Sequence, residues 1–257
     1  MMHKHKQALR LLTTLMKNFL LLALIVASSA CSGEAPVEQP EEHYRYTQEN
    51  QDGTGKFYMD REISWTMGHQ GAGWLNRKTR IKEERTDLLL ENLPISPGDN
   101  IADIGAGTGF FSIPMAELTG SDGTVYAVDI QPEMLARIQK RAAKAGITNV
   151  KLVLATEKSP ALPANTIDMV LMVDAYHEFA WPREVMSAVY ESLTPGGKVV
   201  LIEYRQEDPS VPILRLHKMS EQQVRREMAA VGLEFVENGD FLPQQHFLIF
   251  SKAVETL

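Results

Sequence analysis

The clearest chemical pattern in this sequence is a turn of alternating glycines that follows an acidic residue. The stretch reads D-I-G-A-G-T-G, and the residues that matter are Asp103, Gly105, Ala106, Gly107 and Gly109. Glycine allows positive φ and lets backbone N–H groups approach a ligand closely. In a G-x-G-x-x-G dinucleotide turn the third glycine would fall on the position of a phenylalanine here. The spacing therefore disfavours a nicotinamide-dependent oxidoreductase.

A second acid follows the next apolar run. Asp129 closes the stretch 124–128, more than 20 residues after the first glycine, and Ile130 comes directly after it. An acid at the end of the second strand of such a unit is placed to accept hydrogen bonds from both ribose hydroxyls of a nucleoside. We therefore expect Asp129 and Ile130 to belong to a nucleoside-binding site.

A polar and aromatic loop follows the apolar run 167–173. It contains Asp174, Tyr176, His177 and Glu178. Histidine has an unperturbed pKa near 6.5, which suits a general base. We predict that His177 removes a proton, that Glu178 orients it or takes the proton itself, and that Tyr176 supplies a hydrogen bond or a wall of the pocket.

The elements that would position these residues alternate after residue 98. Strands are expected at 100–104, 124–128, 150–154, 167–173, 198–203, 234–237 and 247–250. Helices are expected at 110–118, 131–145, 184–193 and after the capping residue Ser220, and a turn is expected at 194–197. This alternation predicts an α/β, doubly wound, mostly parallel sheet. The carboxyl ends of its strands would gather the polar loops.

Three motifs together resemble the class I S-adenosylmethionine-dependent methyltransferases, in their ubiquinone/menaquinone-type (type 11/25-like) branch. They are D-x-G-x-G-x-G, the acid that ends the second strand, and L-x-P-G-G before an apolar strand at 193–197. The resemblance covers residues 94–204. It implies a Rossmann-like, seven-stranded sheet with an antiparallel strand at 247–250. It also implies S-adenosylmethionine as cofactor.

The resemblance also assigns the remaining site residues. The branch receives the adenine amino group on an Asp-Ala pair after the third strand, and in this chain Thr156 and Glu157 stand there. A hydroxyl or a neighbouring carboxylate can accept the same hydrogen bond. Asp174 is assigned to the cofactor as well. An N-terminal helical cap over the cofactor is implied for residues 57–93, with an amphipathic helix at 77–91.

Charge and cysteine content narrow the function classes. The chain has 257 residues and a formal net charge of −7. Its first thirty residues contain four basic side chains and no acid, so the remainder has a charge of about −11. No basic stripe is present, which argues against a nucleic-acid partner. The single cysteine, Cys31, excludes an internal disulfide, a cysteine-based metal site and thiolate-dependent methylation. We predict no metal site.

The amino terminus has the pattern of an export signal. Residues 1–17 are basic, 19–27 are apolar, and Ser28-Ser29-Ala30 leads directly into Cys31. The apolar run is short for a spanning helix. It resembles a bacterial lipoprotein signal, so we expect a lipidated Cys31 and a membrane-anchored protein on the periplasmic face. An ordinary signal peptide, or an uncleaved anchor that leaves the protein on the cytoplasmic face, is the alternative.

These observations give four segments: a signal peptide at 1–30, a flexible linker at 31–56, the cap at 57–93 and a methyltransferase domain at 94–257. The linker is rich in Pro, Glu and Gln and poor in apolar residues. The predicted function is methyl transfer from S-adenosylmethionine to a small-molecule acceptor. The alternative is a non-catalytic, S-adenosylmethionine-binding lipoprotein that acts as a sensor or scaffold.

Overall fold

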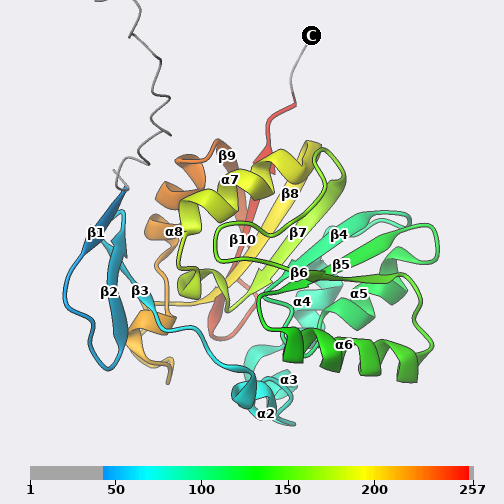
Figure 1. The fold of residues 1–257 in the computed structure, drawn as a ribbon, viewed down its shortest axis with the longest axis horizontal. Helices are drawn as coiled ribbons and strands as arrows, with labels where there is room; N and C mark the ends of the chain where they lie inside the picture. Colours follow the sequence, from blue (N-terminus) through cyan, green and yellow to red (C-terminus); the bar gives the residue numbers. More distant parts are fainter. Residues whose placement is uncertain (1–42, 255–257) are drawn as a thin grey trace, which may run out of the picture. The chain divides into compact units, whose positions relative to one another are not determined.

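Seven strands between residues 100 and 252 form the sheet on which the fold is built (Figure 1). The structure, a computed structural model, describes residues 43–254. The strands are β4 (Asn100–Ile104), β5 (Thr124–Asp129), β6 (Val150–Leu154), β7 (Ile167–Val173), β8 (Leu193–Tyr204), β9 (Leu233–Asn238) and β10 (Gln245–Lys252). Their spatial order is β6-β5-β4-β7-β8-β10-β9, and β10 is antiparallel to both of its neighbours. The predicted fold class and the antiparallel strand are confirmed.

Helices cover both faces of this sheet, and alternate strand residues decide which face each side chain meets. The helices are α4 (Thr86–Asn92), α5 (Ser112–Thr119), α6 (Pro132–Ala145), α7 (Pro182–Ser192) and α8 (Glu221–Ala229). In β8, Val199 and Leu201 pack with residues of α7 and α8, whereas Val200 and Ile202 pack with residues of α4 and α5. Both faces of β8 are therefore apolar.

Local signals account for the ends of two helices. Proline at the first position and Gly146 in the left-handed conformation bound α6. Ser220 begins α8, since its hydroxyl oxygen accepts a hydrogen bond from the Gln223 N–H. Ser220 is the capping residue from which α8 was predicted.

The strand order reverses direction between β4 and β7. From β4 the chain moves outward to β5 and β6, then returns to place β7 on the other side of β4. The loops that leave β4 and β7 therefore diverge and leave a crevice at the carboxyl ends of the strands. This is where the predicted site residues lie.

The segment that precedes the large sheet is less helical than predicted. A second, three-stranded sheet consists of β1 (Tyr44–Tyr46), β2 (Gly53–Tyr58) and β3 (Arg61–Ser64). It occupies part of the predicted linker and part of the predicted helical cap, so both predictions are wrong there. Met59 and Asp60 both have positive φ and join β2 to β3. That turn geometry matches the twist of paired strands, but the usual Asn-Gly signal for it is missing from the sequence.

The helix predicted at 77–91 is two helices. After the short helices η1 (His69–Gly71) and α2 (Ala72–Leu75), α3 (Arg80–Glu84) ends where Arg85 takes a left-handed conformation, with φ of 52°, and α4 follows. The Arg85 guanidinium binds the Asp87 carboxylate in the first turn of α4 at 2.7 Å. Apolar spacing alone does not reveal this break, because the heptad-like pattern continues across it.

The predicted turn at 194–197 lies inside β8. Leu193 pairs with Ile167, and the register between β7 and β8 then shifts before Met169 meets Lys198. Gly196 has φ of 78° at this irregularity. The P-G-G sequence therefore forms a bulge within β8, and strand pairing with β7 continues on both sides of it. It does not form a turn between two separate elements.

Several predictions concern residues outside those that the structure describes. They are the signal peptide, the lipidated Cys31 and the linker before His43. Among the described residues, 43–254, no helix is both long and apolar enough to cross a membrane.

Candidate functional site

A cleft opens at the carboxyl ends of the central strands, where the strand order reverses. It encloses about 930 Å³ of space, part of it open to solvent. The predicted residues that line it are Gly105, Gly107, Asp129, Ile130, Thr156, Glu157, Asp174 and Glu178. These eight residues come from the four loops that the sequence analysis singled out.

The glycine turn after β4 forms one wall of the cleft. Gly105 has φ of 75°, and a Cβ there would lie 2.6 Å from the Ala175 Cβ. A Cβ on Gly107 would lie 2.7 Å from the Leu75 Cδ1. A Cβ at either position would crowd Ala175 or Leu75, so the two glycines leave that space in the cleft open.

Gly109 has a different role. It has φ of 73°, and a Cβ there would approach two side-chain carbons of Ile138 in α6 to 3.2 Å. Gly109 does not line the cleft and instead allows α6 to pack closely on the turn. Ala106 is also buried beside Ile138 and outside the lining.

Asp129 holds the turn in place from the end of β5. Its carboxylate accepts hydrogen bonds from the backbone N–H groups of Gly107 and Gln131, both at 2.9 Å. Burial raises the pKa of Asp129, although these backbone donors oppose the rise. The carboxylate also borders the cleft, as its predicted role with ribose hydroxyls requires.

Asp174 brings an unsatisfied buried oxygen to the cleft. Its Oδ2 accepts a hydrogen bond from the Gln245 Nε2 at 2.7 Å, but its Oδ1 has no hydrogen-bond partner in residues 43–254. Burial raises the pKa of Asp174 well above its usual range, and the carboxylates of Glu84 and Glu203 raise it further. A buried polar atom without a partner is costly, so the geometry favours a ligand donor at Oδ1.

Thr156 and Glu157 line the far wall, after β6. The Thr156 hydroxyl accepts a hydrogen bond from the Ser159 N–H at 3.1 Å, which closes a tight local turn. The Glu157 carboxylate accepts a hydrogen bond from the Trp181 indole N–H at 3.3 Å. Both residues line the cleft, and their contact with adenine stays a prediction.

Asp103 lies behind the glycine turn and not in the cleft lining. It is 3% exposed and accepts a hydrogen bond from the Ser112 hydroxyl at the start of α5. Burial raises its pKa to about 6, against the effect of that hydrogen bond, and nearby Asp129 adds to the rise. Asp103 therefore ties the turn to α5 instead of facing a ligand directly.

His177 is held by a buried carboxylate that the sequence analysis did not assign. Its Nδ1 lies 2.6 Å from the Glu203 Oε2, and its backbone N–H donates to the Glu203 Oε1 at 3.2 Å. Burial alone lowers the pKa of His177, but Glu203 outweighs it and the pKa is raised. An ionised carboxylate can only accept hydrogen bonds, so the His177 Nδ1 carries a proton. In the neutral ring the Nε2 is therefore the unprotonated nitrogen.

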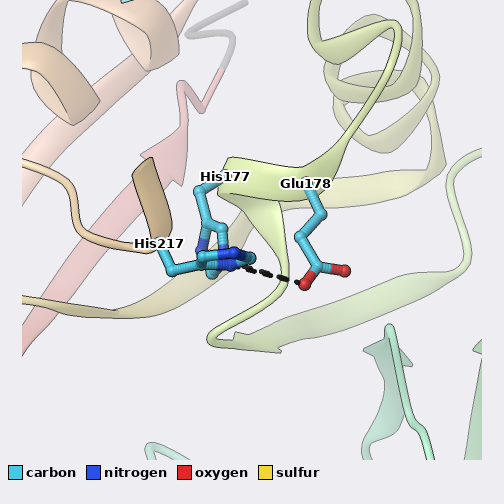
Figure 2. A group of neighbouring side chains, drawn as sticks. All are labelled: His177, Glu178 and His217. Atoms are coloured by element: carbon cyan, nitrogen blue, oxygen red, sulfur yellow. Dashed lines mark hydrogen bonds and ion pairs between the residues drawn. The ribbon is translucent and has the colours of Figure 1, made fainter. Parts of the chain in front are cut away.

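His217 and Glu178 lie beside the unprotonated Nε2 of His177 (Figure 2). The His217 Nδ1 lies 3.0 Å from the His177 Nε2. The Glu178 Oε1 lies 3.8 Å from each of these nitrogens, and its Oε2 accepts a hydrogen bond from the Met67 N–H at 3.0 Å. Of the three, Glu178 is the residue that reaches the cleft, and the two imidazoles stand behind it.

Tyr176 does not face the cleft. It is fully buried, and its hydroxyl donates to the Glu227 carboxylate of α8 at 2.7 Å. Arg61 of β3 pairs with the same carboxylate at 2.7 Å and donates to the His177 carbonyl oxygen at 3.1 Å. The predicted catalytic role of Tyr176 has no support in this geometry. Tyr176 and Arg61 instead fix the loop that carries His177.

Two groups of residues escaped the sequence analysis. Thr66, Met67 and Leu75 line the cleft from the N-terminal segment, which approaches it only through the tertiary fold. Glu203 and Gln245 lie on β8 and β10 and support His177 and Asp174. A charged residue inside the apolar run V-V-L-I-E was a visible signal for Glu203, since buried carboxylates need partners.

The comparisons with known proteins agree with this geometry. A family described as a methyltransferase domain matches residues 95–240, more than half of the chain. Aklanonic acid methyltransferase DauC of Streptomyces sp. (strain C5) is 36% identical over 104 residues, which are 40% of this chain and 46% of that protein. The ubiquinone/menaquinone biosynthesis C-methyltransferase UbiE of Marinomonas sp. (strain MWYL1) is 26% identical over 57% of each chain. This chain thus spans about half the length of these relatives.

A solved structure shares the fold. A SAM dependent methyltransferase from Aquifex aeolicus has a TM-score of 0.68 and 21% sequence identity, with 72% of this chain and 99% of that chain covered. At 21% identity, this structural similarity supports the fold of the chain and nothing further. It matches the seven-stranded, mostly parallel sheet described above.

The raised pKa of Asp103 predicts a pH dependence of stability. The folded state holds the proton up to about pH 6, whereas the unfolded chain releases it near its ordinary value, so stability falls as pH rises between about 4 and 6. In Asp103→Asn this contribution disappears. Relative to the variant, the free energy of unfolding of the native protein should fall by about 3 kcal/mol across that range, as measured by urea denaturation. Parallel pH curves would contradict this assignment.

Proposed function

Because this chain belongs to the methyltransferase domain family, we propose that it transfers the methyl group of S-adenosylmethionine to a small-molecule acceptor. Family membership agrees with the predicted enzyme class, a methyltransferase. S-adenosylmethionine as the methyl donor is part of this proposal. The activity of the whole chain, its acceptor and the roles of its residues are proposals.

The residues of the cleft fit this cofactor. The two glycines of the turn, Gly105 and Gly107, leave space that a Cβ at either position would take from the side chains across the cleft. Asp129 offers a carboxylate at the end of β5, the position suited to ribose hydroxyls. The unpartnered Oδ1 of buried Asp174 can accept a hydrogen bond from an ammonium group, which a methionine moiety supplies. This last observation carries the proposal, because it gives a physical reason for a ligand at that point.

S-adenosylmethionine, when bound, supplies a methyl group already activated by a sulfonium centre. The chain must then place the acceptor in line with that carbon, exclude water and accept a proton where the acceptor carries one. Glu178 borders the cleft, and burial raises its pKa. We assign proton removal to Glu178, with His177 as the residue behind it that stabilises or receives the proton. The sequence analysis named His177 as the base, with Glu178 as its partner or as the base itself, and the present proposal selects Glu178.

A small organic acceptor agrees with the other observations. The names of two relatives, aklanonic acid methyltransferase and ubiquinone/menaquinone biosynthesis C-methyltransferase, indicate small-molecule acceptors for those proteins. The chain is acidic, with a formal net charge of −7, which opposes a nucleic-acid substrate. Apolar walls from Met67, Leu75 and Phe179 suit an aromatic or aliphatic acceptor.

Calorimetric titration with S-adenosylmethionine tests the cofactor site. We expect micromolar binding by the full chain in detergent, and a loss of about 10- to 100-fold in Asp129→Asn. The loss follows because a hydrogen bond to a charged group contributes about 1.5–3 kcal/mol. S-adenosylhomocysteine should bind the native chain with comparable affinity.

Asp122→Asn is the matched control, since Asp122 is an exposed acid in the turn before β5. It should bind as the native chain does. Thermal unfolding of both variants separates lost binding from lost folding. Unchanged affinity in a folded Asp129→Asn variant would rule out the assigned ribose contact, and no binding by the folded native chain would overturn the proposed function.

Substitution of Glu178 tests the chemical step. Quinols and phenols serve as acceptor probes, and S-adenosylhomocysteine formation is measured. We expect Glu178→Gln to lower kcat by about 10²- to 10⁴-fold, the usual contribution of a positioned base. The affinity for S-adenosylmethionine should change by less than about threefold. Full turnover in this variant would remove Glu178 from the mechanism. Cofactor binding without turnover on any probe would favour the sensor or scaffold alternative.

We further propose that the protein is exported and anchored to a membrane through a lipidated Cys31. The support is in the sequence: a basic start, an apolar run at 19–27 and small residues that lead into the only cysteine. In a bacterial host, labelled palmitate should enter the native chain and be absent from Cys31→Ser. The variant should also leave the membrane fraction. Equal labelling of the two proteins would contradict lipidation at this residue.

A further inference from the structure

We propose that His177, His217 and Glu178 bind a divalent first-row transition metal ion of the zinc type. The donor atoms are the His177 Nε2, the His217 Nδ1 and the Glu178 Oε1, and they lie within 4.8 Å of one another. The three side chains point to a common centre from the loop after β7 and from the segment before α8 (Figure 2). The sequence analysis predicted no metal site, and His177 and His217 are 40 residues apart in the chain.

The distances among these atoms suit a metal ion. The two nitrogens are 3.0 Å apart, and the carboxylate oxygen is 3.8 Å from each. Metal–ligand bonds of about 2.0–2.2 Å place neighbouring donors about 3.0–3.5 Å apart, depending on octahedral or tetrahedral geometry. Only the carboxylate has to move by a few tenths of an ångström to complete the arrangement.

The surroundings hold the ligands as metal sites do. Ligand histidines commonly donate their second ring N–H to a carboxylate, which fixes the tautomer and leaves the other nitrogen free. His177 meets that condition, because its Nδ1 lies 2.6 Å from the fully buried Glu203. The Met67 N–H holds the second oxygen of Glu178. Glu203 and the Met67 amide are therefore positioning groups for two of the three ligands.

The chemistry of the donors selects the type of ion. Two imidazoles with one carboxylate suit zinc or a neighbouring transition ion, whereas Mg²⁺ and Ca²⁺ prefer sets made of oxygen. Three protein ligands also leave a coordination position open, as in catalytic zinc sites. The His217 side chain is 28% exposed, so the ion can reach the site from solvent.

The open position has a use that rests on the proposed function. Glu178 belongs both to this cluster and to the lining of the cleft, so the ion would lie beside the acceptor. A hydroxyl oxygen of the acceptor bound to the ion loses its proton to solvent more readily. With the ion present, Glu178 acts as a metal ligand, and the ion takes over the activation of the acceptor that Glu178 would provide as a base without it. A lone pair of the acceptor oxygen then forms the O–CH₃ bond, while the C–S bond breaks and its electron pair remains on sulfur. Neutral S-adenosylhomocysteine leaves.

A proton relay is the competing explanation for the same distances. In that case the His217 Nδ1–H donates a hydrogen bond to the His177 Nε2, and no ion is bound. The two explanations differ in metal stoichiometry, which is measured directly and without any acceptor.

The test titrates the full chain, purified in detergent without a histidine tag and treated with a chelator, with zinc sulfate in a calorimeter. We expect the native chain to bind one Zn²⁺ more than His217→Ala, with a Kd of micromolar or below. Glu178→Gln should weaken this binding at least tenfold, and Glu203→Gln by about 10- to 100-fold. His69→Ala is the matched control, since the half-exposed His69 is also near a carboxylate, Glu133, at 3.8 Å, and should leave the binding unchanged.

The visible absorption of bound Co²⁺ reports on the metal ligands directly. It would not change if Glu203 and His217 had only a structural role. Co²⁺ added to the native chain should give visible absorption bands that shift in Glu203→Gln and disappear in His217→Ala. Equal zinc binding by the native chain and a folded His217→Ala variant, or no zinc binding by the native chain, would overturn the inference. Titration of the same samples with S-adenosylmethionine distinguishes the two proposals, because a failed metal site leaves cofactor binding intact.

Discussion

Glu203 lies near the end of β8 with none of its surface exposed, and the geometry of the candidate site depends on how its carboxylate is satisfied. An ionised carboxylate without partners is strongly disfavoured in the interior of a protein. Here the backbone and the ring of His177 both supply partners. The strand thereby fixes the position, the tautomer and the orientation of the imidazole. The contacts between His177, His217 and Glu178 follow from that constraint.

The loop that carries His177 is also held from the opposite side. Glu227 of α8 receives the Tyr176 hydroxyl and the Arg61 guanidinium, and Arg61 in turn donates to the His177 carbonyl oxygen. Breaking one member of such a buried network leaves an uncompensated polar group, so the network favours a single arrangement. A small N-terminal sheet, a helix and the loop after β7 are therefore linked through one carboxylate.

The cofactor cleft and the histidine cluster share a wall, and that wall is Glu178. On the cleft side lie the glycine turn, Asp129 and Asp174, at the point where the strand order reverses. On the other side lie the two imidazoles. A parallel sheet gathers loops at one edge, but it does not decide what lies behind them. In this chain β8 and the segment before α8 supply that second layer, through Glu203 and His217.

Local patterns were enough to predict the sheet, the glycine turn and the acids at the strand ends, because apolar periodicity, glycine spacing and strand-end position are properties of neighbouring residues. They also placed Gly105, Gly107, Asp129, Asp174 and Glu178 at one edge, and all five line the cleft.

Contacts between residues that are distant in the sequence became visible in the folded chain alone. Glu203 contacts His177 although the two are 26 residues apart in the sequence, and His217 contacts His177 across 40 residues. No local sequence pattern encodes the side-chain orientations that make these contacts. The same holds for the three-stranded N-terminal sheet, whose tight turn at Met59-Asp60 lacks its usual sequence signal. It holds too for Asp103 and Tyr176, which have the residue types of a site but lie buried behind it. Contacts of this kind depend on packing between distant elements, and packing is settled when the chain folds as a whole.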